Sequence, residues 1–160
     1  MTDLCKVLGT TPQRRVLLRN LITYRGLLAS DGYINGFQFI DGSFVENVEI
    51  IGPREPSDID VFSLLHAPQK YHADAALWAS VGLQFWVGEI IDMPKNKARF
   101  KLDTYALLFE EMTPSSLIRN IIYWYSLFSH QRDTFLWKGF VALPLNDADD
   151  QAALLAMGSS

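Results

Sequence analysis

Two aspartates separated by one residue, Asp58 and Asp60, have the spacing that most directly suggests chemistry. They open the segment 58–65, whose Ile, Val and Phe residues predict a β-strand. Because side chains i and i+2 of a strand share a face, the two carboxylates are expected side by side. Ionised carboxylates repel one another unless a cation separates them, and a hard divalent ion suits oxygen ligands. The pair therefore predicts a Mg²⁺ (or Mn²⁺) site. The alternative is a solvated edge strand, or acids that cap nearby helices.

A third carboxylate, Asp103, is expected to join this pair. The segment 98–109 predicts a second strand, on which Lys101 and Tyr105 share the face of Asp103. Three carboxylates on two strands can hold two magnesium ions, which activate a hydroxyl nucleophile and neutralise a leaving pyrophosphate. The alternative for Asp103 is an exposed strand residue paired with Lys101.

A glycine-containing turn, Gly42-Ser43, is the expected phosphate-binding element. It follows the alternating aromatic segment 36–40, which predicts a short strand. A strand that breaks at Gly-Ser often leads into a turn whose backbone N–H groups face an anion. Ser43 and these N–H groups would hold the β- and γ-phosphates of a triphosphate. A plain turn is the alternative.

A second polar cluster is predicted from His130, Arg132 and Lys138. Arg and Lys suit phosphate, so Arg132 and Lys138 are candidate phosphate contacts beside Lys101. Cations are also favourable at the C-terminal end of a helix for purely structural reasons. His130 is either a base or, by the structural interpretation, a polar cap.

The remaining pattern predicts one α+β domain over residues 1–160, with a small mixed β-sheet backed by helices and a core at about 12–145. A helix is expected to begin at Thr11-Pro12 and to end at Asp31-Gly32. The arginines on its outer side predict either a solvated face or part of an anion-binding rim. The segment 46–51 is a short strand or a continuation of the turn, and 83–93 is ambiguous between helix and strand. The other expected elements are helices at 67–81, 114–130 and 147–157 and a strand at 137–145.

Composition restricts the class of protein. The chain is 49% hydrophobic and 20% charged, which is ordinary for a globular protein, and its net charge is −4. Its totals give no basic stripe of the kind that sequence-independent nucleic-acid binders use. A single cysteine, Cys5, excludes an intrachain disulfide and favours a cytoplasmic location. The first residues do not resemble a signal peptide, and no run of about 18 apolar residues predicts a membrane span.

The motifs at 37–109 resemble the polymerase-beta-type nucleotidyltransferase superfamily. The resembling parts are Gly42-Ser43, the run Pro56-Ser57-Asp58-Ile59-Asp60-Val61, and the later Asp103. The resemblance implies that Gly42 and Ser43 form the phosphate turn. It also implies that Asp58 and Asp60 serve both metal ions and that Asp103 helps to activate the nucleophile.

The function implied is transfer of a nucleoside monophosphate from a nucleoside triphosphate, such as ATP, to a hydroxyl of RNA, tRNA or protein. The segments 37–46 and 124–130 and the run Trp137-Lys138-Gly139 are also similar to a group of small bacterial and phage proteins. Some small superfamily members are toxins or antitoxins, and some serve in phage defence. Such a minimal domain often needs a partner protein or a homo-oligomer to complete its site.

Two other functions are compatible with the sequence. The chain could be a non-catalytic binding module or antitoxin of the same fold, with the apolar helix at 117–128 as its docking face. A metal-dependent phosphodiesterase would also use clustered acids, but it would usually require histidine ligands, and none of the three histidines is spaced as a metal-binding pair near these acids.

Overall fold

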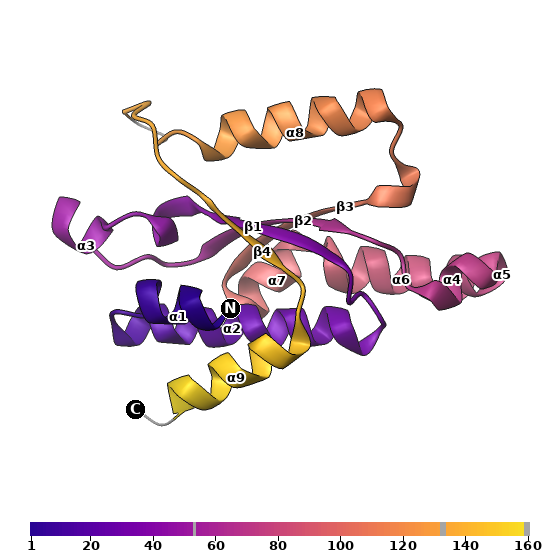
Figure 1. Cartoon of the computed structure of the whole chain (residues 1–160), viewed down its shortest axis with the longest axis horizontal. Helices are drawn as coiled ribbons and strands as arrows, with labels where there is room; N and C mark the ends of the chain where they lie inside the picture. The colour runs from indigo at the N-terminus through magenta and orange to yellow at the C-terminus, as the bar shows by residue number, and fades with distance from the viewer. Residues whose placement is uncertain (53, 132–133, 159–160) are drawn as a thin grey trace.

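A four-stranded mixed β-sheet forms the centre of the computed structural model, which describes residues 1–52, 54–131 and 134–158 (Figure 1). The strands are β1 (Gly36–Asp41), β2 (Ile59–Leu65), β3 (Leu102–Leu108) and β4 (Val141–Pro144), in the order β3-β2-β1-β4. β2 and β3 are parallel, whereas β1 is antiparallel to both β2 and β4. The prediction of a small mixed sheet backed by helices is confirmed.

Helices cover both faces of this sheet unequally. In Figure 1, α1, α2 and α9 lie below the sheet and α8 lies alone above it. The described helices are α1 (Thr2–Leu8), α2 (Pro12–Ser30), α3 (Val48–Ile51), α4 (Gln69–Ala73), α5 (Ala75–Leu77), α6 (Leu83–Phe85), α7 (Met93–Phe100), α8 (Pro114–Phe128) and α9 (Asp147–Gly158). Two 3-10 turns lie at Gly42–Val45 and Phe109–Glu111, and π-helical turns lie at Trp78–Gly82 and Trp86–Ile90. None of the described helices is long and apolar enough to cross a membrane.

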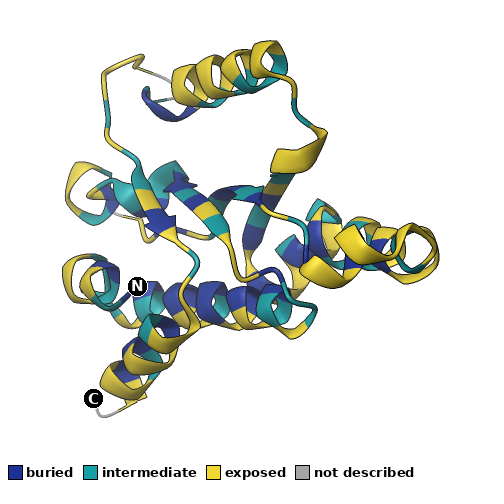
Figure 2. Ribbon diagram, turned by 45° about the vertical axis from the view of Figure 1, so that its right-hand side comes forward, coloured by how far each residue is buried: buried dark blue, intermediate teal, exposed yellow. Residues whose placement is uncertain are grey.

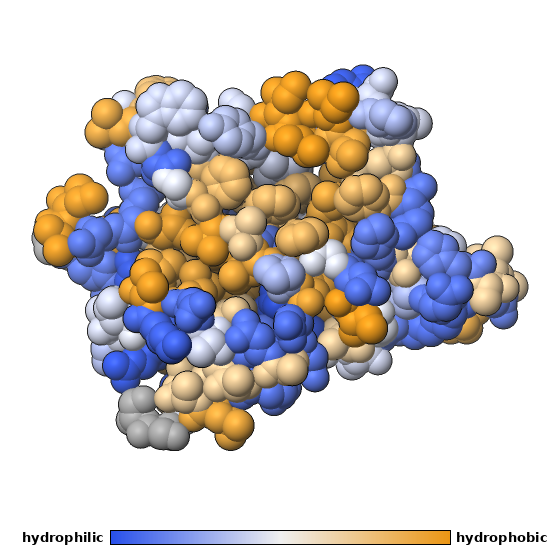
Figure 3. All heavy atoms as spheres, viewed as in Figure 1, coloured by the Kyte–Doolittle hydropathy of each residue, from blue (hydrophilic) through white to orange (hydrophobic). Residues whose placement is uncertain are grey.

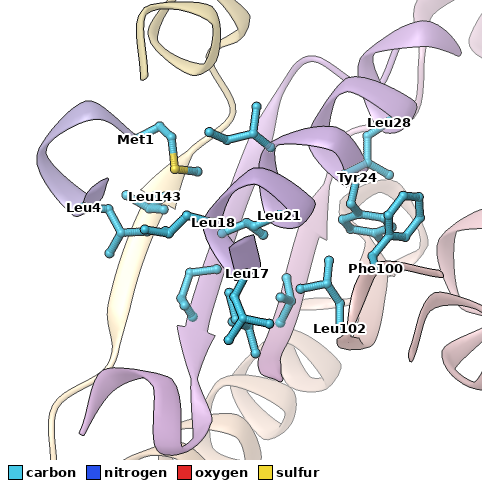
Figure 4. Close-up of a cluster of buried hydrophobic side chains, with 14 of the residues drawn as sticks. Met1, Leu4, Leu17, Leu18, Leu21, Tyr24, Leu28, Phe100, Leu102 and Leu143 are labelled. Atoms are coloured by element: carbon cyan, nitrogen blue, oxygen red, sulfur yellow. The ribbon is translucent and has the colours of Figure 1, made fainter. Parts of the chain in front are cut away.

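The main core lies between α2 and the sheet. Thr11 caps α2, since its Oγ1 accepts a hydrogen bond of 3.3 Å from the backbone N–H of Arg14. Leu17, Leu18 and Leu21 of α2 are fully buried, and Figure 4 shows them against the strands. The strands contribute alternate residues to this core, among them Ile40, Ile59, Val61 and Leu102. The opposite side chains of the same strands therefore face α8.

The expectation that the arginines of α2 form a solvated face or an anion rim is wrong for two of them. Arg14 and Arg25 are 3% and 2% exposed. Arg25 donates hydrogen bonds to Asp150 (2.7 Å), Gln38 (3.0 Å) and the carbonyl of Pro144 (2.8 Å). It therefore joins α2 to β1, β4 and α9, because a buried guanidinium requires partners for its charge and its donors.

The predicted strand at 98–109 is wrong at its start, because residues 98–100 belong to α7. Asp92 caps this helix, since its carboxylate accepts a hydrogen bond of 3.0 Å from the backbone N–H of Lys95. Lys101 ends the helix in the left-handed conformation, with φ of 59°. The strand expected at 137–145 is also shorter than predicted and covers only β4, and 46–51 ends in α3 rather than in a strand.

Candidate active site

Three aspartates lie side by side across the sheet, where strand register brings them together. Asp41 of β1 is the partner of Asp60 of β2, and Asp60 is the partner of Asp103 of β3. Register partners point to the same face, and neighbouring strands are about 4.8 Å apart. Asp41, Asp60 and Asp103 therefore form one acidic row on the face that α8 covers. The structure brings together the predicted Asp60 and Asp103, and it adds Asp41.

Asp58 lies just before β2 and reaches the site through a lysine. Lys97 of α7 places its ammonium between two carboxylates: its Nζ contacts Asp58 Oδ2 and lies 2.6 Å from Asp103 Oδ2. Burial lowers the pKa of Lys97, but its hydrogen bonds with Asp103 and Asp58 outweigh this effect, so its pKa is raised above the usual value. Lys97 is therefore a charged bridge between the start of β2 and the start of β3.

A second lysine neutralises the other end of the acidic row. Lys138 Nζ lies 3.1 Å from Asp41 Oδ1 and 3.2 Å from Glu46 Oε1, and it donates a hydrogen bond of 3.3 Å to the carbonyl of Gly42. Burial raises the pKa of Asp41 to about 6, although the Gly42 N–H and Lys138 both oppose the rise. Lys138, predicted as a phosphate contact, thus lies at the site and is paired there with two carboxylates.

The predicted phosphate turn, Gly42-Ser43, begins directly after Asp41 as the 3-10 turn Gly42–Val45. Gly42 has φ of +79°, which favours glycine, and a Cβ built there would overlap Asp60 Oδ2. Arg14 holds the chain after this turn: it donates hydrogen bonds of 2.6 Å to the carbonyls of Phe44 and Glu46. The turn is therefore held against the acidic row from two sides.

The other two predicted phosphate contacts are Lys101 and Arg132. Lys101 is an exposed residue at the C-cap of α7, and its carbonyl accepts a hydrogen bond of 3.1 Å from the N–H of Ile59. Because Lys101 precedes β3 and has a left-handed backbone, strand alternation does not place its side chain with Asp103. Arg132 lies outside the described residues.

An apolar layer adjoins the acidic row on the same face. Phe39, Phe62 and Tyr105 are register partners two residues along the strands from Asp41, Asp60 and Asp103, respectively. Trp124 of α8 stacks on Phe62, with ring centroids 4.4 Å apart and an interplanar angle of 14°. An apolar cavity of about 170 Å³, which Trp124 helps to line, lies between α8 and the sheet. Its lining comprises Phe39, Phe62, Leu64, Leu107, Met112, Leu117, Asn120, Ile121, Trp124, Tyr125, Phe128 and Phe140.

Sequence reasoning missed Asp41, Lys97 and Glu46 as members of this site. Asp41 was signalled by its position at the end of a strand, directly before Gly42. Lys97 lies on a helix that sequence reasoning assigned partly to a strand, so its approach to Asp103 was hidden. Glu46 joins the site through the hydrogen bond that it accepts from Lys138, which lies 92 positions away in the sequence.

The donor set of the site suits a hard divalent cation in its chemistry. All four aspartates offer carboxylate oxygens, which Mg²⁺ prefers. Asp103 Oδ1 is buried and accepts no hydrogen bond from the described residues. Among those residues, however, no three His, Cys, Asp or Glu side chains converge as they would around a metal ion. The ammonium of Lys97 lies between Asp58 and Asp103 instead, so a metal ion there would require Lys97 to move.

Fold and site together define a mixed α/β protein with a carboxylate row at one end of its sheet. The chain belongs to a family of unknown function (DUF6932), which residues 1–144 match. No curated protein and no solved structure matches the chain. The matched residues include every described member of the site, but the family description names no activity.

The close approach of Gly42 to Asp60 gives a first prediction. Gly42→Ala should lower the free energy of unfolding by about 1–2 kcal/mol, because alanine is strained at positive φ and its Cβ would overlap Asp60 Oδ2. Urea unfolding measures the change. Gly52→Ala is the control, since its added Cβ would meet nothing within 4 Å and its φ is −144°. Equal stability of the two variants would contradict the tight contact.

Proposed function

We propose that this protein is a magnesium-dependent nucleotidyltransferase that moves a nucleoside monophosphate from a nucleoside triphosphate to a hydroxyl. The observation that carries the proposal is the acidic row beside the Gly42-Ser43 turn. Asp60 and Asp103 are direct register partners, and Gly42 approaches the carboxylate of Asp60 closely. Carboxylates next to an anion-binding turn are the two parts that this reaction needs, because the chemistry consists mostly of positioning and charge neutralisation.

In this proposal, Asp58, Asp60 and Asp103 hold the metal ions (Mg²⁺ or Mn²⁺). The metal supplies charge neutralisation of the phosphates and activation of the attacking hydroxyl. Ser43 and the backbone N–H groups around it bind the β- and γ-phosphates, and the Gly42 N–H, which hydrogen-bonds the Asp41 carboxylate, would have to be released to take part. Lys138, which lies against the carbonyl of Gly42, contributes positive charge on the phosphate side of the row. Arg14 keeps the turn in place through the carbonyls that follow it.

The acceptor and setting are part of the same proposal. RNA, tRNA or a protein side chain supplies the hydroxyl. The net charge of −4 argues against an extended nucleic-acid surface, so a protein acceptor stays open. A toxin–antitoxin or phage-defence setting in the cytoplasm follows only from the resemblance of the motifs to small nucleotidyltransferases.

Calorimetric titration with ATP, with and without Mg²⁺, tests this site. The wild type should bind ATP only with Mg²⁺, and Asp60→Asn should weaken binding at least about tenfold, because it removes a charged metal ligand from the centre of the row. Asp74→Asn is the matched control. Asp74 is exposed and caps α5, and asparagine also caps helices well.

Binding that is equal in the wild type and Asp60→Asn would contradict the assignment of the metal ligands. If Asp60→Asn and Asp74→Asn both lose binding, the cause is either misfolding or a faulty titration. Thermal unfolding of Asp74→Asn distinguishes these two causes.

A second candidate function, a non-catalytic binding module or antitoxin, is favoured by the outer face of α8. Ile118, Ile122 and Tyr123 are 58%, 62% and 60% exposed. Figure 2 shows α8 as largely exposed, and Figure 3 shows a cluster of hydrophobic residues on part of the upper edge, where α8 lies. Contiguous exposed apolar side chains on a helix often mark a protein interface. In this alternative, α8 binds a protein chain, and a second copy of this chain is the partner that purified protein can test.

Sedimentation equilibrium distinguishes this candidate. If α8 mediates self-association, the wild type should associate with rising concentration and Ile122→Lys should stay monomeric, because a charge in an apolar interface is costly. Val7→Lys, at a position of α1 that is 68% exposed, should associate like the wild type. A wild type that is monomeric at every concentration would count against self-association through α8.

A further inference from the structure

The ammonium of Lys97 lies between Asp58 and Asp103, two of the carboxylates that would bind the proposed metal ion. Its Nζ contacts Asp58 Oδ2 and lies 2.6 Å from Asp103 Oδ2. The two carboxylates come from different segments, one just before β2 and one at the start of β3, so the lysine closes the gap between them. Its side chain is 39% exposed, whereas those of Asp58 and Asp103 are 23% and 22% exposed. The lysine side chain is therefore more exposed than the two carboxylates that it joins.

The positive charge of Lys97 is smaller than the negative charge of the carboxylates that it contacts. Asp58 and Asp103 carry two formal negative charges when ionised, and Lys97 supplies one positive charge. One carboxylate oxygen, Asp103 Oδ1, stays buried without a hydrogen bond from the described residues. A divalent ion would neutralise more of this charge and could use oxygens that a single ammonium leaves unsatisfied.

A lysine side chain is flexible, so it can occupy the metal position temporarily. Lys97 lies in the last turn of α7, and its flexible stem can withdraw while the helix stays in place. The helix itself is fixed elsewhere: Asn96 donates hydrogen bonds to Thr104 Oγ1 (2.9 Å) and to the carbonyl of Glu89 (3.0 Å). Phe100 packs against Tyr24 of α2. Release of the ammonium thus needs a change of side-chain rotamers only.

We propose that Lys97 is a built-in competitor of the metal ion: it stabilises Asp58 and Asp103 while the ion is absent, and it is released when the ion binds. This inference rests on the metal site of the proposed function and adds a regulatory property to it. Since lysine and ion exclude each other from the same oxygens, the lysine lowers the apparent affinity for the ion. Once released, its positive charge lies near the site, where an anionic triphosphate arrives.

Mn²⁺ binding to the full chain without nucleotide tests this competition, with free Mn²⁺ measured by electron paramagnetic resonance. Lys97→Met should bind Mn²⁺ at least about tenfold more tightly than the wild type, because the competitor is gone and its stem is nearly preserved. Lys97→Arg keeps the charge and should bind no more tightly than the wild type. Lys95→Met is the matched control on α7: its Nζ contacts Glu89 and the carbonyl of Gly88, away from the acidic row.

Thermal unfolding of the same variants gives a second readout. Lys97→Met should be less stable than the wild type without metal, because the carboxylates lose their counter-ion, and Mn²⁺ should raise its Tm more than that of the wild type. If Lys97→Met does not fold without metal, Lys97→Gln, which keeps a hydrogen-bond donor, replaces it with the same expected direction.

Two results would overturn the inference, and they differ. Equal or weaker Mn²⁺ binding by Lys97→Met, with measurable binding by the wild type, would show that Lys97 is not a competitor, and it would leave the proposed function standing. No Mn²⁺ binding by the wild type or by any variant would overturn the metal site itself, and with it both proposals.

Discussion

Repulsion among carboxylates is the constraint on which the rest of this structure depends. The register of three strands places Asp41, Asp60 and Asp103 in one row, and like charges at this spacing destabilise a fold unless cations offset them. Two lysines supply that charge from opposite ends of the row: Lys97 from α7 and Lys138 from the segment before β4. We propose that these carboxylates are kept for a use, since apolar side chains at the same positions would avoid the electrostatic repulsion. The proposed use is to bind a metal ion and the phosphates that accompany it.

Buried arginines hold the elements that surround the row. Arg14 pairs with Glu49 (2.6 Å) and with the carbonyls after the Gly42 turn, so α2 fixes the path of the chain from β1 to α3. Hydrogen bonding to Arg14 lowers the pKa of Glu49, which keeps this pair charged. Arg25 fixes α9 and β4 in the same way through Asp150. Removal of one partner from such a pair leaves a buried charge without compensation and typically costs about 3–5 kcal/mol. The geometry of the site thus depends on contacts far from the carboxylates.

Local patterns in the sequence were enough for β2 and for the start of α2, but not for the bounds of β3 and β4. The β-branched run after Asp58 predicted β2, and Thr11-Pro12 predicted the start of α2, because both signals are local. The place of Asp41 opposite Asp60 depends on strand register, and the approach of Lys97 depends on where α7 ends; neither is encoded in local spacing. The same limit applies to the arginines of α2. Helical periodicity placed them between apolar residues, but only the tertiary partners Glu49 and Asp150 make two of them buried.

Backbone NMR spectra recorded during titration with Mn²⁺ test the central claim, that Asp58, Asp60 and Asp103 form a cation site, most directly. A paramagnetic ion broadens the signals of nearby amides, so the account predicts selective loss of the signals of Gly42, Asp60 and Asp103. Signals of the acidic start of α9, at Asp147 and Asp149, serve as an internal reference for loose binding to surface carboxylates. Broadening at α9 with sharp signals at the acidic row would contradict the account.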